Sequence, residues 1–322
     1  MPEAAAILEV DGATCSFSVG APGLSRLLGR APPRQLHAVA DVSFKVRRGT
    51  TFSIVGESGC GKSTLARMVV GLQKPTGGNL RFADVARADG SVGPPRVQMI
   101  FQDPYASLNP RWRVGDIVAE PIRELKLRSG GRDTQERVGE LLELVGLARA
   151  DAVRFPHAFS GGQRQRISIA RALATEADFL VCDEPTSALD VSVQAQILNL
   201  MTRLQARLGL TYLFISHNLA VVRHMSDDLA IMYLGRFVET GPAEAVFTAP
   251  RHPYTRLLLD TIPDVGKPNR ERRPMSGEVP SPIAPPPGCA FHPRCSLAIK
   301  RCMSERPELH ADEAGRVACH LC

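Results

Sequence analysis

The chain has 322 residues, of which 44% are hydrophobic, and it carries a formal net charge of +6. This length suits one large globular domain with an appendage. There is no run of 18 apolar residues, and the N-terminal segment MPEAAAILEV has no basic residues, so we expect neither a membrane-spanning helix nor a secretory signal. The mild positive charge suits a polyphosphate or an anionic membrane surface, but it is equally that of an ordinary basic protein.

The apolar pattern predicts strands that alternate with helices along the chain. Strands are expected at 8–10, 39–46, 51–55, 97–101, 179–182 and 211–215, with loops at 20–33 and 90–95 and a hairpin-type turn at Gly77-Gly78-Asn79. Three groups of apolar residues at helical spacing each predict a helix: Leu65, Met68, Val69 and Leu72; Val138, Leu141, Leu142 and Val145; and Val193, Ile197, Leu200 and Leu204. Gly146 is placed to end the second of these helices. The stretch 103–159 is expected to be mainly helical, and a further helix is expected at 163–177. This alternation predicts a parallel sheet covered by helices on both faces.

A glycine-rich segment with the sequence GESGCGKST joins the strand at 51–55 to the helix that follows. Its candidate nucleotide-binding residues are Gly56, Glu57, Ser58, Gly59, Cys60, Gly61, Lys62, Ser63 and Thr64. Gly59 and Gly61 lack a Cβ, so the backbone N–H groups can turn toward one centre at the positive end of the helix dipole. Lys62 adds a charge for the β- and γ-phosphates, and Ser63 adds a hydroxyl for Mg²⁺. The segment therefore predicts a phosphate-binding loop.

Three other predicted strands end in polar residues that suit phosphate chemistry. Gln102 follows the strand at 97–101, Asp183 and Glu184 follow the strand at 179–182, and His217 follows the strand at 211–215. Ligands of open α/β sheets lie beyond the carboxyl ends of the strands, so we expect these residues to converge on the γ-phosphate. Asp183 and Gln102 then provide oxygen atoms for Mg²⁺, Glu184 polarises the attacking water, and His217 bonds the γ-phosphate.

The helix at 163–177 is preceded by a second candidate anion site, Ser160, Gly161, Gly162 and Gln163. Ser160 is a good N-cap residue, and the two glycines expose backbone N–H groups at the positive end of the helix dipole. The same sequence pattern is also typical of an ordinary capped helix that binds no anion. Because one nucleotide does not need two such segments, we expect this one to bind the γ-phosphate of a nucleotide held by a second subunit.

In their order along the chain, these segments resemble the motifs of ATP-binding-cassette (ABC) ATPases. GESGCGKST is similar to the Walker A motif, Gln102 to the Q-loop, FSGGQ at 159–163 to the signature, the strand ending in Asp183-Glu184 to Walker B, SALD at 187–190 to the D-loop, and His217 to the switch histidine. Phe159 stands where leucine is commoner. The resemblance implies ATP and Mg²⁺ as cofactors, Asp190 as a further nucleotide-site residue, and Phe17, by spacing, as the residue that stacks on adenine.

The resemblance also implies the fold and the domains. We expect an α/β fold of the P-loop NTPase (RecA-like) type, with a parallel-sheet core, an antiparallel β subdomain and an inserted helical subdomain at about 103–160. The ATPase domain would cover 1–248. Composition changes near Ala249, and 12 of the 25 prolines lie from Pro250 onward, so 249–322 is predicted to be a separate extension, mostly extended or loop.

Further segments resemble one branch, the ATP-binding subunits of bacterial dipeptide and oligopeptide importers. They are IFQDPYASLNPR at 100–111, DLAIMYLGRFVETG at 228–241, RHPYTRLLL at 251–259, SGEVPSP at 276–282 and GCAFHPRC at 288–295. This resemblance implies that Glu184 is the catalytic base and Lys62 the γ-phosphate clamp. It also implies two membrane permease subunits, a second and usually paralogous ATPase subunit, a solute-binding protein, and a peripheral location on the cytoplasmic face of the cell membrane. The segment 103–121 would face the permeases.

Five of the eight cysteines lie between Cys289 and Cys322. The spacing of Cys289, Cys295, Cys302 and Cys319 matches neither zinc ribbons nor ferredoxins, but four thiols in a Pro-rich tail suggest a cross-link, because such a tail has little apolar surface to bury. The importer branch is known for a [4Fe–4S] cluster on a similar tail. The alternatives to a cluster are a zinc site and reduced thiols that bind no metal. His320 and Cys322 lie next to Cys319, so the sequence does not identify the fourth ligand.

The function predicted from the sequence is therefore ATP hydrolysis that powers peptide import. Two alternatives remain at this stage. The same subunit could serve an importer of nickel or another small solute, because the ATPase does not touch the cargo. The second alternative is a soluble ABC ATPase that acts on DNA or ribosomes, but such proteins commonly carry two cassettes or a long coiled coil. This chain has one cassette and no strong basic blocks, so no nucleic-acid partner is expected.

Overall fold

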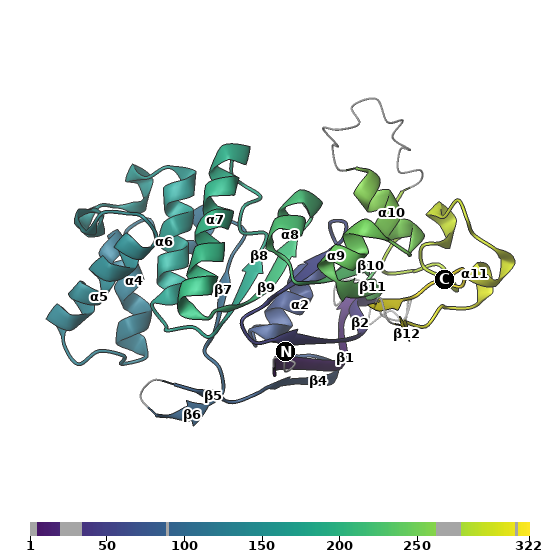
Figure 1. Ribbon diagram of the computed structural model, residues 1–322, viewed down its shortest axis with the longest axis horizontal. Coiled ribbons are helices and arrows are strands. Elements are labelled where there is room, and N and C mark those ends of the chain that lie inside the picture. The colour runs from purple at the N-terminus through teal and green to yellow at the C-terminus, as the bar shows by residue number, and fades with distance from the viewer. Residues whose placement is uncertain (1–4, 20–33, 88–89, 262–277, 313–314) are drawn as a thin grey trace, which may run out of the picture. The chain divides into compact units, whose positions relative to one another are not determined.

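The computed structural model of the chain describes residues 5–19, 34–87, 90–261, 278–312 and 315–322 (Figure 1). The predicted loop at 20–33 lies outside these residues, as does most of the Pro-rich stretch before residue 278. The chain forms two compact units, described one at a time below. Unit 1 comprises Met1–Ile7, Val46–Thr51 and Phe82–Ser216, and unit 2 comprises Leu8–Lys45, Phe52–Arg81 and His217–Cys322. In the described ranges, no helix is both long and apolar enough to cross a bilayer.

Unit 1 contains three parallel strands, which are β7 (Val97–Ile100), β8 (Phe179–Asp183) and β9 (Thr211–Ser216). The central strand β8 pairs with both neighbours, and its register places Cys182 beside Ile100 and Asp183 beside Ile215. Every residue of β8 and β9 is buried. The parallel pairing and the near-continuous apolar runs agree with the sheet that the sequence predicts.

Unit 1 also contains most of the long helices (Figure 1). The long helices are α4 (Val114–Glu124), α5 (Gly131–Leu144), α6 (Gly161–Leu173) and α7 (Val191–Leu208). The shorter elements are α3 (Pro104–Ser107), the 3₁₀ helices η1 (Arg149–Val153) and η2 (Pro156–Ala158), and the ladder of β5 (Val85–Ala86) and β6 (Val92–Gly93). Helix α6 contacts α3, α4, α5 and α7. The predicted stripe at Val138, Leu141, Leu142 and Val145 is buried, and Gly146 with φ +79° follows it. The mainly helical stretch at 103–159 is confirmed.

Unit 2 is built on β3 (Thr51–Val55) and β10 (Asp228–Tyr233), which pair in parallel. Strand β11 (Arg236–Pro242) pairs antiparallel with β10 and with β13 (Gly315–Val317), and β12 (His310–Asp312) pairs with β13. A three-stranded sheet has the order β2 (Arg34–Arg47), β1 (Ala6–Val19), β4 (Gly77–Phe82). The helices are α2 (Lys62–Val69), α8 (Leu219–Met225), α9 (Ala243–Thr248), α10 (Pro253–Asp260), η3 (His292–Arg294) and α11 (Lys300–Ser304).

Two local predictions are wrong. Leu72 does not extend the apolar stripe of α2, because the helix ends at Val69 and the Leu72 side chain is 64% exposed. The predicted hairpin turn at Gly77-Gly78-Asn79 is the start of β4. Gly78 has φ +77°, and a Cβ there would lie 2.2 Å from the carbonyl oxygen of Gly12. Glycine is needed at this position for the close approach to another strand, not for a turn.

The C-terminal extension is less separate than the sequence suggests. Tyr254, Leu258 and Phe291 are buried in one apolar cluster with Val55 and Ile231, so the extension contributes to the core of unit 2. It also adds β13 to the sheet by pairing with β11. The prediction that the tail is mostly extended and has little apolar surface to bury is therefore wrong for these residues. The domain boundaries at 248 and 249 stay a prediction.

Candidate functional site

The predicted phosphate-binding loop follows β3 and precedes α2, in unit 2. Gly61 is the N-cap of α2 with φ +110°, and a Cβ there would lie 2.0 Å from the Ala38 carbonyl oxygen. A Cβ on Gly56 would lie 2.2 Å from the Met232 carbonyl oxygen. Gly59 has φ +79° with open space around it. Close backbone contacts therefore require glycine at positions 56 and 61, and positive φ angles favour glycine at positions 59 and 61.

Lys62 is the first residue of α2, and its side chain is turned back into the loop. Its Nζ donates to the carbonyl oxygens of Gly56, at 2.7 Å, and Glu57, at 3.0 Å, and the residue is only 5% exposed. Ser63 and Thr64 follow at the N-terminus of the same helix, while Ser58 and Gly59 are exposed. The loop thus holds an ammonium group among its own carbonyls, beside backbone N–H groups at a helix N-terminus.

Gln102 and Glu184, both in unit 1, lie in contact as the strand-end prediction requires. The side-chain Nε2 of Gln102 donates to Oε2 of Glu184 at 3.0 Å. Glu184 has φ +48°, a left-handed conformation that is costly for a residue with a Cβ and that is characteristic of functional sites. Its own N–H donates to the Ile215 carbonyl, which fixes the peptide to β9. Asp183, the residue before it, ends β8 and is 5% exposed.

Ser160 caps α6, as the sequence predicts. Its Oγ accepts from the N–H of Gln163 at 3.3 Å, and the Gln163 side chain accepts from the N–H of Ser160 at 3.0 Å, which completes a capping box. Gly161 and Gly162 form the first turn of the helix, and Gly162 is buried. Asp190 is the N-cap residue of α7 and is exposed.

The remaining predicted nucleotide-site residues belong to unit 2. His217 is an exposed residue directly after β9, and Asn218 beside it caps α8 through Oδ1. Phe17 lies near the end of β1 and is 37% exposed. The convergence of Gln102, Asp183, Glu184 and His217 on the phosphate-binding loop stays a prediction, as does the stacking role of Phe17.

The four cysteines of the tail lie near one another, but they do not form a single-ion site. Burial raises the pKa of Cys289 and of Cys295, and in both cases the charges of Cys302 and Cys319 raise it further. Among the residues that the structure describes, no group of three or more His, Cys, Asp or Glu side chains is arranged to hold one metal ion. The described arrangement of these thiols therefore supports neither a zinc site nor a cluster, and the cluster stays a prediction.

One set of contacts of the phosphate-binding loop was not predicted. The guanidinium of Arg294 donates two hydrogen bonds to the carboxylate of Glu57, at 2.8 and 2.9 Å. The hydroxyl of Tyr254 accepts from the N–H of Glu57 at 3.1 Å. No sequence pattern connects residues that lie 237 and 197 positions apart in the chain.

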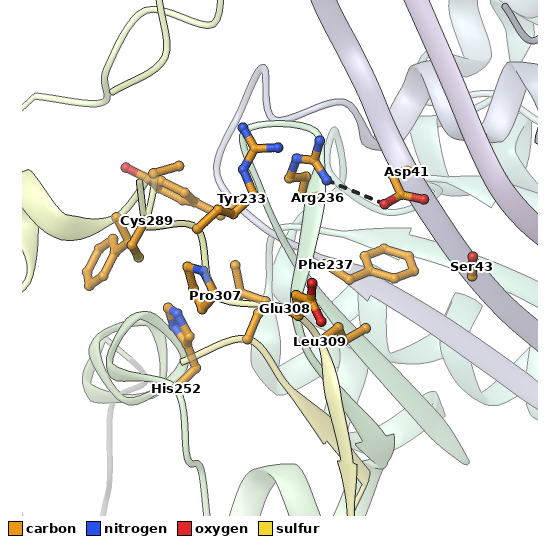
Figure 2. A pocket seen from close by; sticks show the side chains of 15 residues that line it. Asp41, Ser43, Tyr233, Arg236, Phe237, His252, Cys289, Pro307, Glu308 and Leu309 are labelled. Atoms are coloured by element: carbon orange, nitrogen blue, oxygen red, sulfur yellow. Dashed lines mark ion pairs between the residues drawn. The ribbon is translucent and has the colours of Figure 1, made fainter. Parts of the chain in front are cut away.

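A cavity of about 480 Å³ also lies in unit 2, and Tyr233 and Phe291 are among the residues that line it. Figure 2 shows Tyr233 and Cys289 on one side of it and Asp41 and Ser43 on the other, with Arg236 paired to Asp41 at 3.8 Å. None of the predicted ATP-binding residues lines it. The cavity is therefore not the predicted nucleotide site.

Two family models match the chain. The ABC transporter model matches residues 39–187, and the model of the C-terminal region of oligopeptide/dipeptide transporters matches residues 238–302. Among solved structures, an ATP-binding cassette dimer in a post-hydrolysis state with ADP and phosphate is similar at a TM-score of 0.60 and 24% identity, over 73% of this chain and 98% of that one. The protein cbiO1 of Clostridium perfringens is similar at a TM-score of 0.60 and 25% identity, over 76% of this chain and 91% of that one.

Curated relatives are similar over most of the chain. A di/tripeptide transport ATP-binding protein of Pseudomonas aeruginosa, DppF, is 49% identical over 89% of this chain and 90% of its own length. A putative oligopeptide transport ATP-binding protein of Bacillus subtilis, YkfD, is 48% identical over 89% of this chain and 90% of its own length. The dipeptide transport ATP-binding protein DppF of Escherichia coli is 47% identical over 90% of this chain and 88% of its own length. The chain therefore belongs to the ABC transporter ATPases, in the family of dipeptide and oligopeptide transport ATP-binding proteins.

Proposed function

We propose that this chain is the ATP-hydrolysing subunit of an importer of dipeptides or oligopeptides. The observation that carries the proposal is the similarity along nine-tenths of the chain, C-terminal region included, to relatives named for peptide transport. That similarity favours peptides over nickel or another small solute. It also favours transport over a soluble ABC ATPase that acts on nucleic acid.

In this proposal ATP occupies the phosphate-binding loop. Lys62 leaves the loop carbonyls to clamp the γ-phosphate, and the N–H groups of Gly56–Thr64 bind the phosphate oxygens. Ser63, Gln102 and Asp183 provide the hard oxygen ligands that suit Mg²⁺, which when bound neutralises phosphate charge. Phe17 stacks on adenine.

Glu184 accepts the proton of the attacking water. The hydrogen bond from Gln102 and the constrained backbone of Glu184 support this role, because both fix the position of its carboxylate. His217 bonds the γ-phosphate. The segment Ser160–Gln163 and Asp190 serve the nucleotide of a second cassette, since one nucleotide does not need two phosphate-binding segments.

The partners in this proposal are two membrane permeases, a second and paralogous ATPase subunit, and a solute-binding protein in the complete system. The chain then works at the cytoplasmic face of the cell membrane as a peripheral protein. The segment 103–121 would contact the permeases. Its exposed aromatic side chains support this assignment, because Tyr105 is 59% exposed and Trp112 41%.

The substitution Glu184→Gln tests the catalytic assignment. We expect MgATP binding to persist and steady-state hydrolysis to fall by at least about 100-fold, because the amide cannot accept the proton of water. Glu140→Gln is the matched control in the same unit, since Glu140 is exposed and pairs with Arg137 at 2.9 Å on the surface. Undiminished hydrolysis by Glu184→Gln would refute the role of Glu184.

The transport assignment is tested by purification of the tagged chain from membranes. We expect two permeases and a second ATPase to co-purify, and we expect the assembled system to show peptide-stimulated ATP hydrolysis. Stimulation by nickel but not by peptides would support the first alternative. Co-purification with nucleic acid or ribosomes would support the second.

We also propose that Cys289, Cys295, Cys302 and Cys319 hold a [4Fe–4S] cluster. Soft thiolate ligands suit such a cluster, and the resemblance of this tail to that of the importer branch favours the cluster over zinc. Iron and sulfide analysis of protein purified without oxygen tests it, with an expected ratio of about four of each per chain. Zinc in their place, or no metal, would contradict the cluster.

A further inference from the structure

Three polar groups of Glu57 are held by neighbouring side chains in unit 2. Its carboxylate accepts two parallel hydrogen bonds from Arg294, its N–H donates to Tyr254, and its carbonyl accepts from Lys62 at 3.0 Å. Arg294 belongs to η3 and Tyr254 to α10, both far beyond the cassette motifs in sequence. The second residue of the phosphate-binding loop is therefore held mainly by the C-terminal part of the chain.

The pair of Arg294 and Glu57 is shielded from water. The Arg294 side chain is 3% exposed and that of Glu57 is 14% exposed. The guanidinium carbon lies 5.9 Å from the ring centre of Tyr233 and 6.0 Å from that of Phe291. Charges buried to this degree need their partner, because an unpaired buried charge is strongly unfavourable. The parallel, two-bond geometry also restricts where the Glu57 carboxylate can lie.

The packing around the pair connects the tail to this part of unit 2. Phe291 lies 5.4 Å from Tyr233 and 5.3 Å from Tyr254 between ring centres, and the two tyrosines lie 4.7 Å apart. Cys289 and Cys295 pack against the same apolar cluster. The tail at 289–295 therefore packs directly against the residues that hold Glu57.

A carboxylate at the second position of a loop built for polyphosphate is unfavourable on its own. Like charges at close range in a partly dry site repel more strongly than in water. The Arg294 guanidinium cancels this charge without entering the loop itself. It also fixes the peptide whose carbonyl receives Lys62.

We propose that Arg294 is a positioning residue for the phosphate-binding loop, which it completes from the C-terminal extension by neutralising and orienting Glu57. The inference rests on the proposed binding of ATP at Gly56–Thr64. It assigns the extension a part in nucleotide binding. The extension is then required for ATP affinity whether or not the tail holds a metal.

The test is nucleotide affinity of Arg294→Gln in the full-length chain. We expect its Kd for MgATP to rise by about tenfold, because the buried Glu57 carboxylate then faces the phosphates unpaired. The loss should be smaller for ADP and absent for adenosine, since it depends on phosphate charge. A purely structural role of Arg294 would weaken all three ligands alike.

Two further variants separate charge from fold. Arg294→Lys keeps the charge but loses the two-bond geometry, so its Kd should fall between those of the unaltered protein and Arg294→Gln. The double variant Glu57→Gln with Arg294→Gln removes both charges, so it should bind MgATP more tightly than Arg294→Gln alone, because no unpaired carboxylate then faces the phosphates. Arg301→Gln is the control, because Arg301 lies in the same tail and pairs with Glu305 on the surface.

The inference is overturned if folded Arg294→Gln, checked by circular dichroism, binds MgATP as the unaltered protein does. It is also overturned if the double variant is as weak as the single one, or if the loss is equal for ATP and adenosine. Lys62→Ala tests the underlying site separately. If Lys62→Ala binds MgATP normally, the proposed ATP site itself is wrong.

Discussion

At the scale of single residues, Gly162 marks a place where α6 and α7 leave no room for a side chain. A Cβ at this position would lie 2.4 Å from Cγ1 of Val193. Valine in a helix has one strongly preferred rotamer, so Val193 cannot easily turn away. We expect Gly162→Ala to destabilise the protein by about 1–3 kcal/mol, as overpacking does, and to lower the melting temperature in a thermal scan.

Gly161→Ala is the matched control for this prediction. A Cβ on Gly161 would lie 3.4 Å from Leu189, which is ordinary contact, and alanine favours a helix over glycine by about 0.5–1 kcal/mol. The melting temperature of this variant should stay the same or rise. Equal melting temperatures for the two variants would show that the close contact with Val193 has no energetic consequence.

At the scale of elements, α10 begins with a histidine that must stay neutral. Nδ1 of His252 accepts from the N–H of Tyr254 at 3.1 Å, so His252 caps the helix that brings Tyr254 to Glu57. Burial lowers the pKa of His252 from its usual 6.5 to about 4; the charge of Arg256 lowers it further, and a hydrogen bond with the Ala318 backbone opposes the shift. Protonation of Nδ1 would remove the cap.

This pKa predicts how stability depends on pH. The unfolded chain takes up the proton near pH 6.5 and the folded chain only near pH 4, so the contribution of His252 is complete above pH 6.5 and is lost as the pH falls toward 4. The loss reaches about 3 kcal/mol at the low end. We expect His252→Asn, which caps but does not titrate, to flatten the decline in melting temperature between pH 6.5 and 4. An unchanged decline would contradict the assignment.

How much could be predicted from sequence also differs between elements. β3, the phosphate-binding loop and the start of α2 were predictable, because glycine, lysine and apolar spacing act within a few residues of one another. Strand β4 was not predictable, because glycine at position 78 is required by the backbone of Gly12 on β1, which is far away in the sequence. Pairing of β13 with β11 and the contact of Arg294 with Glu57 likewise depend on the folded chain.

At the scale of the whole molecule, the chain has two candidate phosphate-binding segments, which is more than one nucleotide needs. The loop at Gly56–Thr64 and the capped N-terminus at Ser160–Gln163 both present backbone N–H groups at a helix start. Ser160 is exposed, and the capping box bonds the N–H groups of Ser160 and Gln163 but not those of Gly161 and Gly162. The proposal that a second cassette shares each ATP follows from this excess.

This sharing predicts an assembly that depends on both nucleotide and partner. We expect Glu184→Gln with MgATP to remain monomeric by light scattering when purified alone, and to form a one-to-one dimer when co-purified with the paralogous ATPase of its transporter. Adding Ser160→Arg should abolish that dimer, because a bulky cation at the cap blocks the shared phosphate position, while binding of ATP to the chain itself persists. Omission of nucleotide is the control. A dimer of Glu184→Gln formed alone with MgATP would contradict the paralogous pair and would show instead that the chain pairs with its own copy.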